Sequence, residues 1–256
     1  MSPSIDLNAD LGEGFGAYRH DQDAELLALV TSANVACGFH AGDPLIMRST
    51  VAAAVKHGVA VGAHPGYPDL LGFGRRDLSA TPSEITAYLI YQIGALQAVC
   101  HAGGTRLRYV KAHGALYNRA VVDRSVADAI AEGVRAADPE LTLLGLANSY
   151  LLTAARAAGL RTAAEAFADR AYARDGSLVP RSQAGSVMHD VDAVVARTVR
   201  LASTGRVTSI DGQELSVKPD SICVHSDTPG AIELLRAIRR GLTDAGVSIA
   251  PFTAVA

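Results

Sequence analysis

Four histidines of this chain stand at the ends of short apolar runs, each within a turn rich in glycine, proline or aspartate. The segments are NVACGFHAGDP (34–44), VAVGAHPGYPDLLGFGRR (59–76), YVKAHGALYN (109–118) and ICVHSDTPGA (222–231), and the histidines are His40, His64, His113 and His225. Apolar runs of this length between turn residues predict buried strands of a parallel sheet. Ligands of α/β folds gather at the carboxyl ends of such strands, so the four imidazoles are expected to converge on one active site.

Carboxylates and a lysine accompany these histidines. Asp6, Asn8 and Asp10 alternate in SIDLNADLGEGFG and so share one face of a predicted strand, and Glu13 follows in the turn. Several acids this close repel one another unless they are hydrogen-bonded, metal-bound or protonated. Lys111 stands two residues before one of the histidines and would offset developing negative charge. Such a set of residues is typical of general acid–base chemistry.

A long, charged loop follows another apolar run. Its sequence is EAFADRAYARDGSLVPRSQAG (165–185), and its length and charge favour a functional loop over a plain connection. Arginines in such loops often hold carboxylates or phosphates through two parallel hydrogen bonds. The candidate functional residues that the loop offers are Glu165, Asp169, Arg170, Arg174 and Arg181.

Several well-known motifs are missing from the chain. The phosphate loop G-x-x-x-x-G-K-[ST] and a strand-linked G-x-G-x-x-G are absent. A nucleotide would therefore need a partner chain or an unrecognised turn, built from Gly12, Gly14 and Gly16 or from Gly72 and Gly74. H-E-x-x-H and G-x-S-x-G are absent as well, which disfavours zincin and α/β-hydrolase chemistry.

Strands and helices are predicted to alternate along the whole chain. Strand candidates are 4–8, 33–37, 59–63, 107–111, 141–146, 161–166, 220–225 and 247–250, and helix candidates are 21–32, 43–57, 82–102, 121–137, 148–158, 188–204 and 229–245. This pattern indicates one α/β domain over residues 1–256, a single irregular β/α (TIM-like) barrel of seven or eight strands, with an open doubly wound sheet as the alternative. Alternation around Asp211 and Gly212 predicts a small hairpin inserted near 205–219.

Composition and charge exclude several classes of function. Hydrophobic residues make up 49% of the chain and aromatic residues 5%, which fits Ala-rich helices around aliphatic strands. The net charge of −3 and the lack of a Lys/Arg run give no support to binding of nucleic acid or a membrane surface. The uncharged stretch between Glu84 and Arg106 repeats its apolar residues at helical steps, which favours an amphipathic helix over a membrane span. Scattered cysteines and the lack of a leader peptide indicate a cytoplasmic protein.

Six segments of the chain together resemble the 5-oxoprolinase A-subunit family, also called the LamB/YcsF family. They are DLNADLGEGFG, NVACGFHAGDP, GAHPGYPDLLGFGRR, KAHGALYN, EAFADRAY with the later DGSLVPRSQAG, and CVHSDTPGA. They occur in the family's order, so the resemblance runs from about residue 5 to about residue 252. The departures are small: the family often has proline where Ala112 stands and glycine where Ser226 stands.

The resemblance implies an irregular β/α barrel related to the glycoside hydrolase/deacetylase superfamily. It also implies ATP-dependent opening of 5-oxo-L-proline (pyroglutamate) to L-glutamate, with ATP as co-substrate and two further partners, the B and C subunits of 5-oxoprolinase. A five-membered lactam is a poor electrophile, and closure of the glutamate ring is favourable, so hydrolysis needs coupling to ATP. Phosphorylation of the amide oxygen would create a leaving group at the carbonyl carbon, which water then attacks.

This reaction suggests a role for each group at the strand ends. Asp10 is expected to be the general base, His64 and His113 to polarise the lactam or carry protons, and Lys111 to offset phosphate or oxyanion charge. Either Arg170 or Arg181 would hold the substrate carboxylate. The residues expected to bind substrate are Asn8, Glu13, His40, Arg75, Asp169, Arg170, Arg181, His225 and Asp227.

Two other functions stay open at this point. A metal-dependent deacetylase or amidase, acting on a sugar or a small amide without ATP, would use Asp10, His40 and His64 as a mixed nitrogen and oxygen ligand set. A non-catalytic subunit would bind the lactam while its partners perform the chemistry. A divalent metal is therefore an alternative cofactor.

Overall fold

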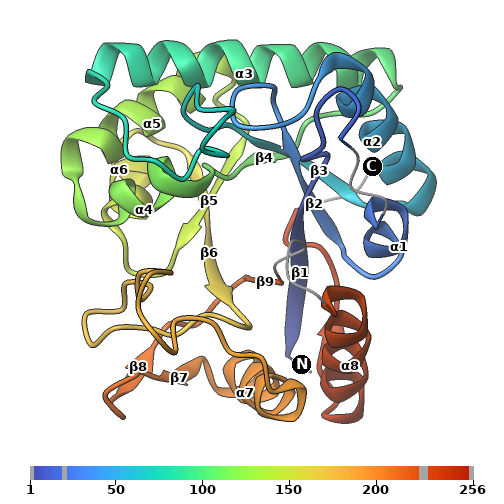
Figure 1. The fold of residues 1–256 in the computed structure, drawn as a ribbon, viewed down its shortest axis with the longest axis vertical. Coiled ribbons are helices and arrows are strands. Elements are labelled where there is room, and N and C mark those ends of the chain that lie inside the picture. The colour runs from blue at the N-terminus through green and yellow to red at the C-terminus, as the bar shows by residue number, and fades with distance from the viewer. Residues whose placement is uncertain (1–2, 19–21, 225–229, 254–256) are drawn as a thin grey trace.

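Seven parallel strands close into a barrel at the centre of the molecule (Figure 1). The computed structural model describes residues 3–18, 22–224 and 230–253. In barrel order the strands are β1 (Ser4–Leu11), β2 (Ser32–Ala36), β3 (Ala60–His64), β4 (Tyr109–Val110), β5 (Thr142–Leu146), β6 (Arg161–Phe167) and β9 (Ser221–Cys223). β9 pairs with β6 on one side and with β1 on the other, which closes the barrel. The predicted β/α barrel is confirmed, and the open doubly wound sheet is wrong.

A short further strand joins the barrel at its amino-terminal end. β10 (Ser248–Ile249) pairs in parallel with Ser4 and Ile5 of β1, whereas β2 pairs with Asn8 to Leu11 further along the same strand. β1 therefore contacts three strands, and the last part of the described chain returns to the start of the barrel.

Helices connect the strands and cover the outside of the barrel (Figure 1). They are α1 (Asp23–Leu27), α2 (Pro44–His57), α3 (Pro82–Ala102), α4 (Gly114–Val122), α5 (Arg124–Ala137), α6 (Tyr150–Ala157), α7 (Val191–Thr204) and α8 (Ala231–Asp244). Their buried residues, such as Leu89 and Ile93 of α3, share one hydrophobic core with strand residues such as Leu7. Within the described residues no helix, α3 included, is long and apolar enough to cross a membrane.

The chain between β4 and β5 forms two helices, where one helix over 121–137 was predicted. Asp123 separates α4 from α5 with an extended backbone (φ −109°, ψ 109°). Its carboxylate accepts hydrogen bonds from two backbone N–H groups in the first turn of α5. The predicted boundary is wrong because this N-cap lies inside a helical sequence pattern. As a consequence His113, expected in a turn, occupies the N-cap position of α4.

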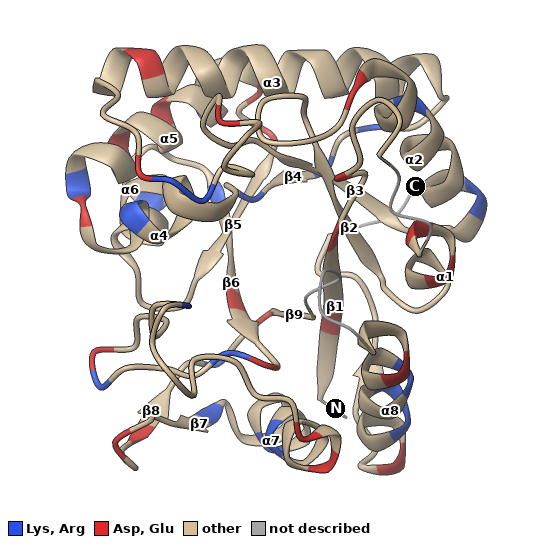
Figure 2. Ribbon diagram, in the orientation of Figure 1, with Lys and Arg blue, Asp and Glu red and all other residues tan. Residues whose placement is uncertain are grey.

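The inside of the barrel is polar. The Asp6 carboxylate accepts hydrogen bonds from the hydroxyl groups of Thr31, Ser32 and Ser221, which come from the start of β2 and from β9. Although these donors favour the charged form, burial outweighs them and raises the pKa of Asp6 to about 6. Figure 2 shows further acidic positions on β1 and β6. The barrel therefore holds a hydrogen-bonded network in place of aliphatic layers.

An aromatic pair lies at the amino-terminal end of this network. The Tyr109 ring centroid is 5.0 Å from that of Phe252, and the Tyr109 hydroxyl donates a 2.7 Å hydrogen bond to the Asn34 side-chain oxygen. Gly62 of β3 leaves room for the tyrosine, because a Cβ atom there would lie 2.2 Å from the Tyr109 ring. The strand needs glycine at this position to keep the ring inside the barrel.

A two-stranded antiparallel sheet precedes β9. It consists of β7 (Arg206–Thr208) and β8 (Glu214–Ser216), and Gly212 in the connection has a left-handed backbone (φ 81°). The sheet occupies the segment 205–219 and does not pair with the barrel strands.

Candidate active site

Side chains from the ends of four neighbouring strands meet at the carboxyl-terminal mouth of the barrel. They are Asp10 in β1, Glu13 after β1, His40 after β2, His64 at the end of β3, and Lys111 and His113 after β4. All are buried except Asp10, whose side chain is 15% exposed. The structure thus brings three of the four strand-end histidines together, whereas His225 and Asp227 lie outside the described residues.

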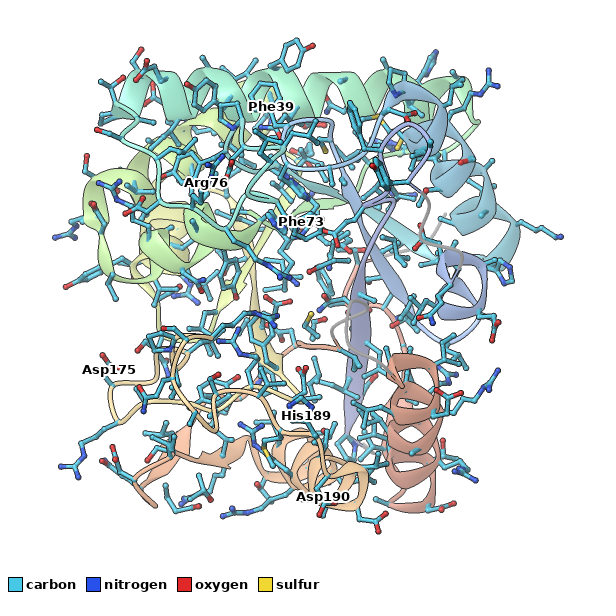
Figure 3. All side chains as sticks on the ribbon, viewed as in Figure 1. Phe39, Phe73, Arg76, Asp175, His189 and Asp190 are labelled. Atoms are coloured by element: carbon cyan, nitrogen blue, oxygen red, sulfur yellow. The ribbon has the colours of Figure 1, made fainter. Side chains whose placement is uncertain are left out.

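Backbone carbonyl groups fix the tautomers of two of these imidazoles. His64 Nδ1 lies 2.8 Å from the Lys111 carbonyl oxygen, and His113 Nε2 lies 2.8 Å from the Phe73 carbonyl oxygen. Because a carbonyl only accepts, these two ring nitrogens carry the hydrogens. Phe73 presents its carbonyl from a left-handed backbone (φ 53°), a conformation that is costly for a bulky residue. Figure 3 shows Phe73 beside the centre of the molecule.

His40 packs flat against His113. The two ring centroids are 3.6 Å apart with an interplanar angle of 2°, and His40 Nε2 lies 3.2 Å from Glu13 Oε1. Its other nitrogen, Nδ1, is buried and has no hydrogen-bond partner among the described residues. Burial, together with positive charge on the neighbouring histidines, holds the pKa of His40 and of His113 well below the usual range.

Asp10 connects the histidines to a buried lysine. Its Oδ1 atom is 3.4 Å from His64 Nε2 and 3.2 Å from Lys111 Nζ. Burial opposes the charged form of His64, but the Asp10 carboxylate raises the pKa of that imidazole above its usual value. The Asn34 side-chain amide donates a 2.8 Å hydrogen bond to the same carboxylate oxygen. Asp10 is therefore held in place by a cation, an imidazole and an amide.

The Lys111 ammonium group lies inside the barrel with carboxylates on two sides. Its Nζ atom is 2.8 Å from Glu165 Oε1 and 3.2 Å from Asn8 Oδ1, in addition to its contact with Asp10. Burial opposes the charge, yet the nearby anionic groups, Asp10 foremost, hold the pKa of Lys111 well above its usual value. Lys111 is therefore a fixed positive charge at the bottom of the site.

Three residues that sequence reasoning left out of the site complete this network. Glu165, completely buried in β6, accepts hydrogen bonds from the hydroxyl of Tyr117 (2.7 Å) and the amide of Asn8 (3.1 Å). Asn34 joins Asp10 to Asn8. A charged residue within the apolar run TAAEAF was the signal for Glu165, whereas nothing in the sequence separates Asn34 and Tyr117 from ordinary polar residues.

A cavity of about 380 Å³ opens above these groups. Its lining includes Asp10, His64, Lys111 and His113, and also Arg75, Arg170 and Arg181. Carboxylate, imidazole and ammonium groups thus meet three guanidinium-bearing residues around one space. A cavity of this size and polarity suits a small anionic molecule.

The loop arginines differ in what they contact. Arg170 is 5% exposed and donates hydrogen bonds to the carbonyl groups of Ser186 (3.3 Å) and Val179 (2.6 Å), so it holds the loop together. Arg181 is exposed, and Arg75 is exposed with its guanidinium 5.0 Å from the Phe73 ring centroid. Asp169, next to Arg170, is buried. Both arginines expected to hold a substrate carboxylate line the cavity, but the Arg170 guanidinium donates to backbone carbonyl groups whereas Arg181 is exposed.

Four of the clustered side chains lie close enough together that they could hold a metal ion. One ligand atom from each of Glu13, His40, His64 and His113 lies within 4.8 Å of the others. This set differs from the Asp10, His40 and His64 set that the sequence suggested, since Glu13 and His113 belong to it and Asp10 also contacts Lys111. Imidazole and carboxylate ligands suit Zn²⁺ and related divalent transition metals.

The fold and the site together define a parallel β/α-barrel protein with a buried acid–histidine–lysine site at the carboxyl ends of its strands. More particularly, the chain belongs to the LamB/YcsF family, whose model matches residues 5–256. The family resemblance of the six sequence segments is thereby confirmed.

Individual relatives agree with this membership. The chain is 53% identical over 249 residues to the 5-oxoprolinase A-subunit 1 of Agrobacterium fabrum, which covers 97% of this chain and 98% of that protein. It is 52% identical over 244 residues to the 5-oxoprolinase A-subunit of Syntrophobacter fumaroxidans, with 95% and 96% covered. The crystal structure of the lactam utilization protein from Thermus thermophilus superposes with a TM-score of 0.91 at 48% identity, covering 96% of this chain and 99% of that one.

Proposed function

We propose that this chain is the A-subunit of a multi-subunit 5-oxoprolinase, which opens 5-oxo-L-proline to L-glutamate with hydrolysis of ATP. The observation that carries the proposal is that Asp10 lines the cavity and contacts both the Lys111 ammonium and the His64 imidazole. The names of the relatives, which refer to 5-oxoprolinase and to lactam utilization, support the same substrate.

The chemistry needs each of these groups. Transfer of the γ-phosphoryl group of ATP to the lactam oxygen, with loss of ADP, makes the ring carbon electrophilic. Water adds to that carbon as a base takes its proton, the ring C–N bond breaks as nitrogen takes a proton, and a second water releases phosphate. In this proposal Asp10 accepts the proton from water, and its contacts with His64 and Asn34 keep it oriented. Lys111 stabilises the negative charge that develops on oxygen.

The other lining residues bind and orient the substrate. His64 and His113 line the cavity with Asp10, and in this proposal they polarise the lactam or pass the proton to nitrogen. Arg181 and Arg75 lie at the same cavity and provide positive charge for the substrate carboxylate. Arg170 keeps the Arg181 loop in position through its carbonyl contacts.

The test is an assay of glutamate release from 5-oxo-L-proline. The chain is measured alone and with the B and C subunits, each with and without ATP. The proposal predicts release that depends on ATP and on the presence of this chain. Equal release from the B and C subunits without this chain contradicts it.

One observation favours a second candidate function, a metal-dependent amidase or deacetylase that needs no ATP. It is the cluster of Glu13 and three histidines at the edge of the same cavity. Release of acetate or of an amine from small amides without ATP, lost on removal of metal, would support this candidate. Release of glutamate that requires ATP supports the lactam-opening function over it.

A further inference from the structure

Two imidazoles of the site face each other with nitrogen atoms that carry no hydrogen in their neutral forms. His64 Nε2 and His113 Nδ1 are 3.0 Å apart, and the opposite nitrogen of each ring donates to a backbone carbonyl oxygen. Each ring has only one hydrogen when neutral, so the facing nitrogens present two lone pairs to each other. Lone pairs at this distance repel, so the arrangement calls for a cation between them.

A third imidazole and a carboxylate point at the same place. Glu13 Oε1 is 3.2 Å from His40 Nε2 and 3.5 Å from His113 Nδ1. Ligand atoms about 2.1 Å from a tetrahedral metal ion lie about 3.4 Å from one another. Three separations within this cluster, of 3.0 to 3.5 Å, are close to that value. All four ligand atoms lie within 4.8 Å of one another, so small shifts of the side chains would bring them to one ion.

We propose that Glu13, His40, His64 and His113 bind one divalent transition-metal ion of the Zn²⁺ class. Three imidazole nitrogens and one carboxylate oxygen match the preference of Zn²⁺ and its neighbours, whereas Mg²⁺ and Ca²⁺ prefer oxygen ligands. The ligand set consists of one carboxylate and three neutral imidazoles. Its single negative charge attracts a divalent cation.

Residues around the cluster orient its imidazoles through hydrogen bonds, as is usual for metal sites in proteins. The carbonyl groups of Lys111 and Phe73 accept from the non-ligating nitrogens of His64 and His113, and such outer contacts orient metal-bound histidines. Backbone packs tightly against the rings as well. A Cβ atom at Gly74 would lie 2.7 Å from both His40 and His113, so only glycine fits there. The rings of His64 and His113 are therefore oriented before any ion binds. The His40 ring, which is stacked on His113, has to turn out of that stack to share the ion.

The metal ion would lie beside the reacting groups. His64 and His113 line the cavity, and Asp10 Oδ1 is 3.4 Å from His64 Nε2. If the proposed lactam-opening function holds, the ion supplies the polarising charge that would otherwise fall to the two imidazoles. The inference of a metal site rests on the ligand geometry and does not depend on that substrate.

A single proton is the other cation that fits between two imidazoles. It would give one imidazolium donating to the other ring, with Asp10 as counter-ion. The metal ion and the shared proton make different predictions. If a proton alone joins the two rings, the chain has no affinity for a metal ion at this site.

The experiment measures metal uptake without substrate or partner subunits, so its outcome is separate from that of the activity assay. The chain is freed of metal with a chelator, and Zn²⁺ and Co²⁺ are titrated in by calorimetry and by the visible absorption of bound Co²⁺. We expect one ion per chain, a tetrahedral-type Co²⁺ spectrum, and a rise in melting temperature on binding. Affinity should fall at least about 100-fold in His64→Gln and in Glu13→Gln.

His57→Gln and His101→Gln serve as matched controls, because both histidines are exposed at the ends of helices outside the cluster. They should bind the ion as the unaltered chain does. Absence of Zn²⁺ and Co²⁺ uptake by the unaltered chain overturns the inference without the use of any variant. Equal uptake by the unaltered chain and by correctly folded His64→Gln and Glu13→Gln overturns it as well.

Discussion

At the scale of single residues, the site is built around one buried cation. Lys111 has Glu165 on one side and Asp10 on the other. Asn8 donates to the Glu165 oxygen that Lys111 contacts, and Tyr117 donates to the other oxygen. Paired charges of this kind are stable only while both signs are present. Glu165 therefore fixes the position of Lys111 and, through it, that of Asp10.

The substitution Glu165→Gln should reveal this dependence. It removes one of the two carboxylates beside Lys111, so the free energy of unfolding should fall by about 3 kcal/mol. Denaturant unfolding measures the change, and Glu132→Gln on the exposed side of α5 is the control. An unfolding free energy equal to that of the control would show that Lys111 does not need Glu165.

Asp6 gives a pH dependence of stability. Its pKa is raised from 3.8 to about 6, so the folded chain holds the proton more tightly than the unfolded chain. The stability from this group is complete below about pH 4 and is lost as the pH rises through about 6. Relative to Asp6→Asn, the unaltered chain should lose roughly 3 kcal/mol of unfolding free energy between these limits. Parallel stability curves for the two chains, measured from pH 4 to pH 7, would contradict this assignment.

At the scale of helices and strands, local patterns predicted most of the fold. Apolar runs between glycine- and proline-rich turns marked most strands of the barrel, because strands covered on both faces are largely apolar. β1 differs, since it alternates apolar residues with Asp6, Asn8 and Asp10. The boundary at Asp123 was missed, because an N-cap inside a continuous helical pattern cannot be distinguished from an exposed helix residue. The turns of His40, His64 and His113, and Lys111, directly follow predicted strands, and Asp10 lies near the end of β1, so the same local patterns drew attention to them.

The rest of the site depends on contacts between distant parts of the chain. The hydroxyl of Tyr117 on α4 reaches Glu165 on β6, 48 residues away, and Asn34 on β2 reaches Tyr109, 75 residues away. Such pairs arise only when the barrel closes, so no local pattern signals them. The candidate metal-ligand set differs from the sequence-based prediction for the same reason. The sequence suggested Asp10 with His40 and His64, whereas the folded loops group Glu13 and His113 with these two histidines.

Two glycine substitutions test the packing of these elements with opposite signs. Gly62→Ala in β3 places a methyl group against the Tyr109 ring and should destabilise the chain by about 3 kcal/mol. Gly94→Ala in α3 meets nothing within 4 Å and should stabilise it by up to about 1 kcal/mol, since alanine is the better helix former. Thermal unfolding of the two variants measures both effects. Equal stability of the two would contradict the close packing of β3 on Tyr109.

At the scale of the whole molecule, the barrel mouth and the loop over residues 165–185 form one cavity. If the proposed function holds, Arg181→Gln should raise KM for 5-oxo-L-proline about 10-fold or more with little change in kcat, because it removes a positive charge from the cavity that would bind the substrate carboxylate. Arg170→Gln should mainly lower the melting temperature, because its contacts are to the loop backbone. Steady-state kinetics and thermal unfolding separate the roles. A change of KM confined to Arg170→Gln would reverse the assignment.

The most direct test of the account is ATP-dependent glutamate release by the chain together with the B and C subunits, compared between the unaltered chain, Asp10→Asn and Asp128→Asn. Asp128 is exposed on α5, away from the cavity, and serves as the control. The account predicts that Asp10→Asn lowers kcat by about 100-fold or more while its circular dichroism spectrum stays that of the unaltered chain. Asp128→Asn should keep full activity. Near-normal glutamate release by a folded Asp10→Asn variant would contradict the role of Asp10 as the general base.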